Sequence, residues 1–367
     1  MKKMILLIVL AGCPAKSSGT HAKDDHGSSA SNAPLTDDAM PPAPGDAGAP
    51  NVTLGPAPAA PAVPFGLPAT DGTPALHPEA IALGELLFFE PRISASGTTS
   101  CATCHDPDHG WSDLRPRANV DGGQPNLRRT PAIANLLWQV TRGGFGWDGR
   151  YGTLVDLVAS HWKGQLGMAP ADAIAKVASV PLYGAHLERQ PGAQPAEAAA
   201  ENALAEFVLS RYQGNAPWDR YEHGDHAAVS ADAAKGYALF TGKAQCSVCH
   251  VPPLYTDGGY HAIGLIKLPD EGRGRVDAAA KGAFKTPTLR GATAHAPYFH
   301  DGSATTLEAA IDWHLAGGTG QGADRSIIDP ALAPIVLAPD ERLQLIAFVR
   351  TLSAPSPAPY KRPELPQ

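Results

Sequence analysis

The cysteines of this chain are its first candidates for chemistry, because four of the five form two C-x-x-C-H motifs. The motifs are CATCH, with Cys101, Cys104 and His105, and CSVCH, with Cys246, Cys249 and His250. In such a motif the two thiols add to the vinyl groups of a c-type haem, and the histidine becomes the proximal iron ligand. A single motif also fits a redox dithiol or half of a zinc site. Two copies, with no cysteine left over for a disulfide, predict two covalently bound haem c groups.

A longer repeat accompanies the two motifs. Residues 148–161 (DGRYGTLVDLVASH) and 301–314 (DGSATTLEAAIDWH) both read D-G-x-x-x-T-L-x-x-x-x-x-x-H without a gap. Each segment follows a T-P element, which is RTPAI in the first copy and KTPTL in the second. One duplicated unit therefore carries, in each copy, a C-x-x-C-H motif and a later helix that bears a histidine. We expect His161 and His314 to face the first and second haem.

The absence of methionine after the second motif limits the choice of a sixth ligand for the second haem. Methionine is the usual partner of histidine on a cytochrome c iron. The methionines all precede the second motif, at Met1, Met4, Met40 and Met168. The ligand candidates that follow this motif are His261, His295, His300 and His314. The repeat favours His314, because it places this residue on the helix expected to face the haem.

Helices must position these motifs, and strand signals are sparse. Each motif follows an apolar-periodic helix that contains G-x-x-L-F, at residues 84–88 and 236–240. A glycine in such a helix permits a close helix crossing, and the last apolar helix, around residues 340–352, is a candidate crossing partner. Ser230 is suited to cap the start of the second helix, and Gly242 follows its end. The spacing of Thr305 and Glu308 predicts a capping box for the helix that carries His314.

The start of the chain is typical of an exported protein. The sequence MKKMILLIVLAGC has two lysines, an apolar run too short to span a bilayer, and a lipobox-like ending that makes Cys13 a candidate for lipidation. A plain signal peptide with an incidental cysteine is the alternative. Residues 14–64 are rich in Ala, Pro, Gly, Ser and Asp, which predicts a disordered tether. The net charge of −7, without a basic run, argues against nucleic acid as a partner.

These features predict an all-α protein with two cytochrome c-like domains. The predicted segments are a lipoprotein signal at 1–12, a tether at 13–75, a first domain at 76–225, a second domain at 226–356 and a tail at 357–367. Its expected location is periplasmic, with a lipid anchor at Cys13 as the only link to a membrane.

Several longer stretches resemble the bacterial di-haem cytochrome c peroxidase family, which includes MauG-like enzymes. They are LGELLFFEPRISASGTTSCATCHDPDHGWSD, RTPAIANLLW, GWDGR and FKTPTLRGATAHAPYFHDGSATTLEAAIDWH, within residues 76–353. The resemblance implies that the first haem meets hydrogen peroxide and that the second accepts electrons from a small donor, a c-type cytochrome or a cupredoxin. It also implies that Trp147 relays electrons between the haems. The family's sixth ligand at the second haem, methionine or tyrosine, falls at His314.

The chain departs from the family at two catalytic positions. Where peroxidases of this family carry a glutamine and a catalytic glutamate, this chain has Leu157 and Gly167. Neither can move the proton that cleavage of the O–O bond requires. His161 lies one helical turn after Leu157 on the same face, and Gln165 is also nearby. His161 either replaces the lost acid–base group or caps the first iron and blocks peroxide, and the sequence leaves both open.

A third departure concerns the calcium ion that the resemblance implies between the domains. The side chain that would bind it is an asparagine in the family and Arg129 in this chain. Calcium takes oxygen ligands, and arginine offers none. Arg129 either supplies the positive charge itself, with the carbonyls of His295 and Pro297 as acceptors, or points to solvent.

Three functions therefore compete. The first is a peroxidase, in which His105 anchors the peroxide-binding haem, Trp147 relays, and His250 with His314 holds the other haem. The second is an electron-transfer cytochrome in which histidines close both irons. The third is a MauG-like oxidase of a partner protein. The family favours the peroxidase, while the missing glutamine and glutamate favour the electron carrier.

Overall fold

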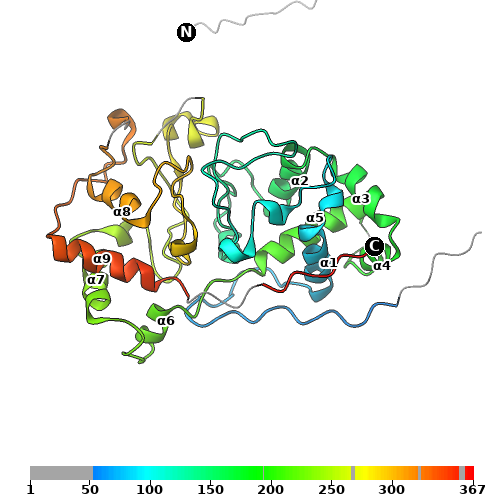
Figure 1. The fold of residues 1–367 in the computed structure, drawn as a ribbon, viewed down its shortest axis with the longest axis horizontal. Coiled ribbons are helices and arrows are strands. Elements are labelled where there is room, and N and C mark those ends of the chain that lie inside the picture. Colours follow the sequence, from blue (N-terminus) through cyan, green and yellow to red (C-terminus); the bar gives the residue numbers. More distant parts are fainter. Residues whose placement is uncertain (1–52, 193, 266–268, 321–323, 355–359) are drawn as a thin grey trace, which may run out of the picture. The chain divides into compact units, whose positions relative to one another are not determined.

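The structure is a computed structural model, which describes residues 53–192, 194–265, 269–320, 324–354 and 360–367. The expectation of a mainly helical chain is confirmed over these residues (Figure 1). The helices are α1 Pro78–Phe89, α2 Leu154–Gln165, α3 Pro170–Ala178, α4 Pro181–Glu188, α5 Ala196–Leu209, α6 Pro217–Glu222, α7 Ala231–Thr241, α8 Leu307–Leu315 and α9 Pro339–Thr351. Two short strands, β1 Tyr260–His261 and β2 Phe284–Lys285, pair antiparallel. In the described part of the chain no helix has the length and apolar character needed to cross a membrane.

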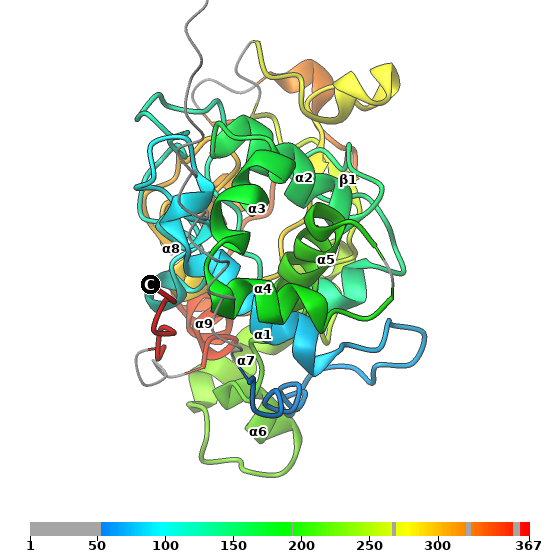
Figure 2. The same cartoon turned by 90° about the vertical axis from the view of Figure 1, so that its right-hand side faces the viewer.

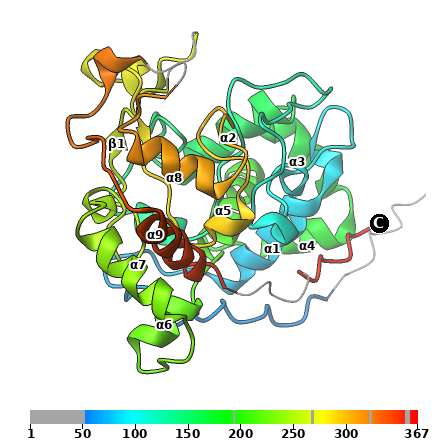
Figure 3. The ribbon, with the colours of Figure 1, turned by 60° about the vertical axis from the view of Figure 1, so that its left-hand side comes forward.

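Two glycine-mediated helix crossings organise the fold, and they have the same geometry. Helix α1 crosses α5, and α7 crosses α9, as Figures 1 and 3 show. A Cβ added at Gly84 would lie 2.0 Å from the carbonyl oxygen of Ala203, and one added at Gly236 would lie 2.0 Å from that of Gln344. The predicted partnership between α7 and the last helix is confirmed. The equivalent partner of α1 is α5, which was not predicted from the sequence.

The second crossing makes a testable prediction about stability. We expect Gly236→Ala to lower the free energy of unfolding by about 1–3 kcal/mol, because the new methyl group must push α7 and α9 apart. The matched control is Gly164→Ala in α2, where the residue is exposed and an added Cβ meets nothing within 4 Å. This control should stabilise the protein by less than about 1 kcal/mol, because alanine is the better helix former. Chemical denaturation of both variants measures the difference, and equal effects would contradict the close crossing.

Of the two helix caps predicted from the sequence, one is confirmed and one is wrong. Ser230 caps α7 by accepting a hydrogen bond from the backbone N–H of Ala233, as predicted, and Gly242 ends that helix. Helix α8, however, is capped by Thr306, so the predicted capping box from Thr305 to Glu308 is wrong. Thr306 corresponds in the repeat to Thr153, which caps α2. The helices of the two copies therefore begin at equivalent threonines.

Apolar side chains form two clusters, one for each half of the chain. The first gathers residues of α1 to α5, whose arrangement Figure 2 shows from their own side. The second is built around Phe240, Tyr255 and Phe348. Trp218 of α6 packs into this second cluster, although the predicted boundary after residue 225 assigns α6 to the first domain.

Both ends of the described chain pack against the body. The signal, Cys13 and the tether up to residue 52 lie outside the described residues. Residues 53–75 do not behave as a tether, so the prediction is wrong for them: Leu67 packs on the first cluster, and the carbonyl of Ala69 accepts a 3.0 Å hydrogen bond from the indole N–H of Trp138. At the other end, Tyr360 stacks on Phe89 with ring centroids 5.7 Å apart.

Candidate haem sites

The second C-x-x-C-H motif begins on a short turn of 3₁₀ helix, Cys246–Val248, directly after α7. The ring of His250 is oriented by its Nδ1 atom, which donates a 3.1 Å hydrogen bond to the carbonyl of Tyr255. Burial, followed by the nearby His314, lowers the pKa of His250 to about 4. The ring is therefore neutral at physiological pH, and its Nε2 lone pair is available to a metal.

His314 lies opposite His250, with the two ring centroids 6.4 Å apart and the ring planes inclined by 67°. Its Nδ1 atom donates a 2.8 Å hydrogen bond to the carbonyl of Ala310 within α8. Metal-binding histidines almost always donate their second ring N–H in this way, which fixes the ring and the tautomer. The two residues would therefore be able to hold one iron between them, and the ligand role of His314 stays a prediction.

The other three candidate histidines contact other residues and do not face His250. His261 has a carboxylate oxygen against each ring nitrogen, at 2.6 Å and 2.8 Å. His300 stacks on Phe284, with centroids 3.5 Å apart. His295 is buried beside Arg129, and its ring lies against Gly110 of the first half of the chain. These contacts leave His314 as the residue that faces His250.

The first motif opens on a cavity of about 730 Å³, within the size range of cofactor sites. Its lining residues include Cys101, Cys104, His105, Trp147 and His161. The Nδ1 atom of His105 donates a 3.2 Å hydrogen bond to the carbonyl of Trp111, as His250 does to Tyr255. The two proximal histidines are therefore held alike, and both fit iron ligands.

The cysteines of both motifs are partly buried. Burial, with the neighbouring Cys104 as a smaller cause, raises the pKa of Cys101 to about 12. Burial also raises the pKa of Cys246 to about 12. Such surroundings disfavour a charged thiolate, while the uncharged thioether of an attached haem matches them. The four sulfurs are free of disulfides, which leaves both pairs available for haem attachment.

His161 projects from α2 and lines the same cavity as His105. Burial lowers the pKa of His161 to about 4, with smaller contributions from His105 and Arg150. Among the described residues its ring has no hydrogen-bond partner, unlike the rings of His105, His250 and His314. A neutral ring without a fixed second nitrogen fits an acid–base group better than a permanent iron ligand.

Leu157 and Gly167 occupy the positions of the family's catalytic glutamine and glutamate, and only the first of them lines the cavity among the described residues. Leu157 and Gln165 line the cavity with His161, all from α2. Gly167 lies just beyond the end of α2 with φ +66°, and it is not among the described residues that line the cavity. Of the polar side chains that α2 presents to this cavity, His161 is therefore the titratable one, and near pH 7 its neutral ring has a lone pair that can accept a proton.

Trp147 bridges the two halves of the chain. Its indole N–H donates a 2.8 Å hydrogen bond to the carbonyl of Arg129, and its own carbonyl accepts one of 2.8 Å from the backbone N–H of Lys285 in β2. Its ring centroid lies 6.4 Å from that of His300, in the second half. This position between the halves suits the relay role that the family resemblance implies.

Arg129 is buried, so the alternative that it points to solvent is wrong. Its guanidinium donates to the carbonyls of Thr130, Asp113 and Ala296, at 3.1, 3.0 and 3.3 Å. The acceptors expected from the family, at His295 and Pro297, are therefore also wrong, although Ala296 lies between them. Burial lowers the pKa of Arg129, but a guanidinium stays charged under physiological conditions.

The position of Arg129 predicts indifference to calcium. We expect chelators to leave the activity, the haem spectra and the melting temperature unchanged, because the guanidinium already contacts the carbonyls between the two halves. The informative variant is Arg129→Asn, which restores an oxygen ligand and should make the melting temperature rise with added calcium. Loss of activity of the parent protein with a chelator, restored by calcium, would contradict the prediction.

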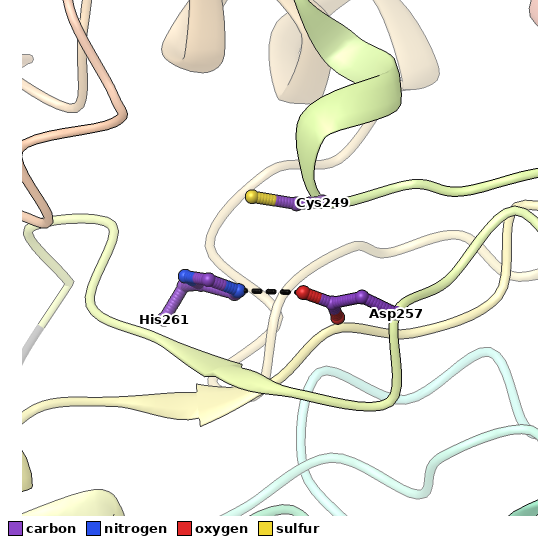
Figure 4. Close-up of side chains that lie close together, drawn as sticks. All are labelled: Cys249, Asp257 and His261. Atoms are coloured by element: carbon purple, nitrogen blue, oxygen red, sulfur yellow. Dashed lines mark hydrogen bonds and ion pairs between the residues drawn. The ribbon is translucent and has the colours of Figure 1, made fainter.

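One cluster was missed at the sequence level. Asp257 and Asp329 flank His261. Figure 4 shows His261 and Asp257 beside Cys249. His261 was considered as an iron ligand, but no local pattern connects it with a carboxylate 68 residues away. The proximity arises from tertiary packing.

Comparisons with known proteins agree with this geometry. The family model for the di-haem cytochrome c peroxidases matches residues 78–227. The chain is 39% identical to the methylamine utilization protein MauG of Methylorubrum extorquens, over 79% of this chain and 82% of that protein. It is 32% identical to the cytochrome-c peroxidase IdrP2 of Pseudomonas sp. strain SCT, over 78% and 84%. A solved MauG-like protein associated with microbial copper homeostasis shares the fold, with a TM-score of 0.71 at 24% identity, over 81% of this chain and 98% of that one.

Proposed function

Because this chain belongs to the di-haem cytochrome c peroxidase family, we propose that it reduces hydrogen peroxide with electrons from a small c-type cytochrome or a cupredoxin. Two haem c groups, when attached at the two motifs, supply the redox chemistry of peroxide reduction and electron acceptance. Cys101, Cys104 and His105 hold the first group. Cys246, Cys249 and His250 hold the second, with His314 as its sixth ligand.

The observation that carries the peroxidase assignment is the state of His161. A neutral imidazole that lines the cavity of the first site can accept the proton of bound peroxide and return it to the leaving oxygen. This is the work of the glutamate that the family has at the position of Gly167. A ring without a fixed second nitrogen also argues against the closed, bis-histidine electron carrier. Trp147 lies between the two halves, where an electron relay is required.

Steady-state peroxide consumption tests this proposal. The holoprotein, with two haem additions verified by mass spectrometry, is mixed with peroxide and a pre-reduced c-type cytochrome or cupredoxin. We expect donor oxidation at two equivalents per peroxide. The control is a variant in which Cys101 and Cys104 are alanine, which should carry one haem and lack turnover. A two-haem protein that oxidises neither donor would contradict the proposal.

A second candidate function is long-range oxidation of residues on a partner protein. It is supported by the 39% identity to a protein named for methylamine utilization, MauG. The distinguishing result is peroxide consumption that requires a protein substrate and no pre-reduced donor. Turnover with small donors alone favours the peroxidase.

The proposed location is periplasmic, with a lipid on Cys13 as the membrane anchor. The sequence MKKMILLIVLAGC supports it. We expect Cys13→Ser to move the protein from the membrane fraction to the soluble fraction of the cells, without any change in its haem spectrum. Fractionation followed by haem staining measures this, and continued membrane retention of the variant would contradict the lipid anchor.

A further inference from the structure

A histidine held between two carboxylates lies beside the second attachment motif, and Figure 4 shows it with one of them, Asp257. The Nε2 atom of His261 lies 2.8 Å from Asp257, and its Nδ1 atom lies 2.6 Å from Asp329. The ligand atoms of Cys249, Asp257 and His261 all lie within 4.8 Å of one another. We refer to Asp257, His261 and Asp329 as the triad.

The geometry fixes the charge of the triad. An ionised carboxylate only accepts hydrogen bonds, so a ring with a carboxylate at each nitrogen must carry both of its protons. The pKa of His261 is raised, first by the free Cys249 sulfur and then, against burial, by Asp329 and Asp257. The two carboxylates still raise it when the sulfur is bound to haem, because their hydrogen bonds to the ring do not involve Cys249. Burial opposes ionisation of both carboxylates, but hydrogen bonds from His261 hold their pKa values below the usual range. One positive and two negative charges leave the triad with a net charge of −1.

The triad is built into the fold around the second haem site. The backbone N–H of Asp257 donates a 2.8 Å hydrogen bond to the carbonyl of Cys249, and that of Asp329 donates one of 2.8 Å to Ala262. His261 itself belongs to β1. The three side chains are only about a quarter exposed, at 25%, 25% and 27%, so solvent and salt screen their charges incompletely.

A metal ion is the other occupant that such residues suggest, and two facts argue against it. Both nitrogens of His261 are already paired with carboxylates, so neither lone pair is free for a metal. The sulfur of Cys249 is used for haem attachment in the proposed holoprotein. The hydrogen bonds account for the cluster as it stands.

We propose that the triad sets the reduction potential of the second haem and thereby selects the donors that can reduce it. This inference deepens the proposed function and rests on haem attachment at Cys249. Local charge, burial and hydrogen bonding are among the means by which a protein adjusts a haem potential. The imidazolium of His261 favours the reduced haem, which carries one positive charge fewer, and the two carboxylates favour the oxidised haem.

The test uses three charge variants of the holoprotein. Asp329→Asn changes the net charge of the triad from −1 to 0, His261→Gln changes it to −2, and the double variant restores −1. Spectroelectrochemical titration at about pH 6, where even an unperturbed imidazole is largely protonated, reports the potential of each haem. We expect a higher potential of the second haem in Asp329→Asn, a lower one in His261→Gln, and a return towards the parent value in the double variant.

Controls separate charge from structure. The potential of the first haem should stay constant, and Asp324→Asn, in the same segment but without contact to His261, should leave both potentials unchanged. Shifts of equal sign in the two single variants, or no shift, would overturn the proposal. If His261→Gln loses a haem, Asp329→Asn with both haems attached still decides the sign. The titration needs no peroxide, so a protein without peroxidase turnover can confirm the triad, and an active peroxidase can refute it.

Discussion

Replacing His314 with alanine should convert the second haem from a low-spin, bis-histidine centre to a high-spin or water-ligated one. The reason is geometric: His314 faces His250 at a centroid distance of 6.4 Å, and the other histidines after the second motif are held elsewhere. Optical and electron paramagnetic resonance spectra of the as-isolated protein measure the change. Peroxide turnover with small donors should fall sharply, because the haem that accepts electrons is altered.

The matched variant is His314→Met, which keeps six ligands. A thioether stabilises ferric iron less than an imidazole does, so the potential of the second haem should rise, and a weak thioether-to-iron band should appear in the near infrared. An alanine variant that retains the low-spin bis-histidine spectrum would show that another residue is the ligand. His300 would then be the next to replace, because both nitrogens of His261 are bound to carboxylates.

Replacing His161 with alanine should lower peroxide turnover by about 10²–10⁴-fold, the usual contribution of a positioned acid–base group. The spectrum of the first haem should stay the same, because His161 is assigned to proton transfer and not to iron binding. With its pKa at about 4, the parent ring stays neutral as the pH falls from 8 to about 5. Turnover should therefore not decline near pH 6.5, where an unperturbed histidine would become charged.

The control for this variant is Gln165→Ala, which removes another polar side chain that α2 presents to the cavity. It should reduce turnover far less than His161→Ala, because an amide does not exchange protons near neutral pH. A different outcome would identify the electron carrier: His161→Ala would turn the first haem from low-spin to high-spin and would raise peroxide reactivity. Stopped-flow mixing with peroxide distinguishes the two results.

The sequence alone determined the parts of this protein that rest on covalent chemistry and duplication. Two C-x-x-C-H motifs specify haem attachment, because thioether formation needs those residue types at that spacing. The repeat located the helices α2 and α8 and the histidines that face each site, while the cap of α8 at Thr306 was not predicted. The glycine of G-x-x-L-F, placed against the last helix, predicted the crossing of α7 and α9.

Only the tertiary structure decided the roles that depend on contacts between distant residues. His261 became part of a charged triad because Asp329, 68 residues away, packs against β1. Arg129 is buried, and its guanidinium donates a hydrogen bond to the carbonyl of Ala296, which is 167 residues away in the sequence. Residues 53–75 and Tyr360 pack on the first half through a few apolar and backbone contacts, which cannot be predicted from the composition of these segments. Periodicity and motifs report what a segment can do by itself, while the charge state and partner of a buried side chain are set by whatever the folded chain brings within hydrogen-bond distance.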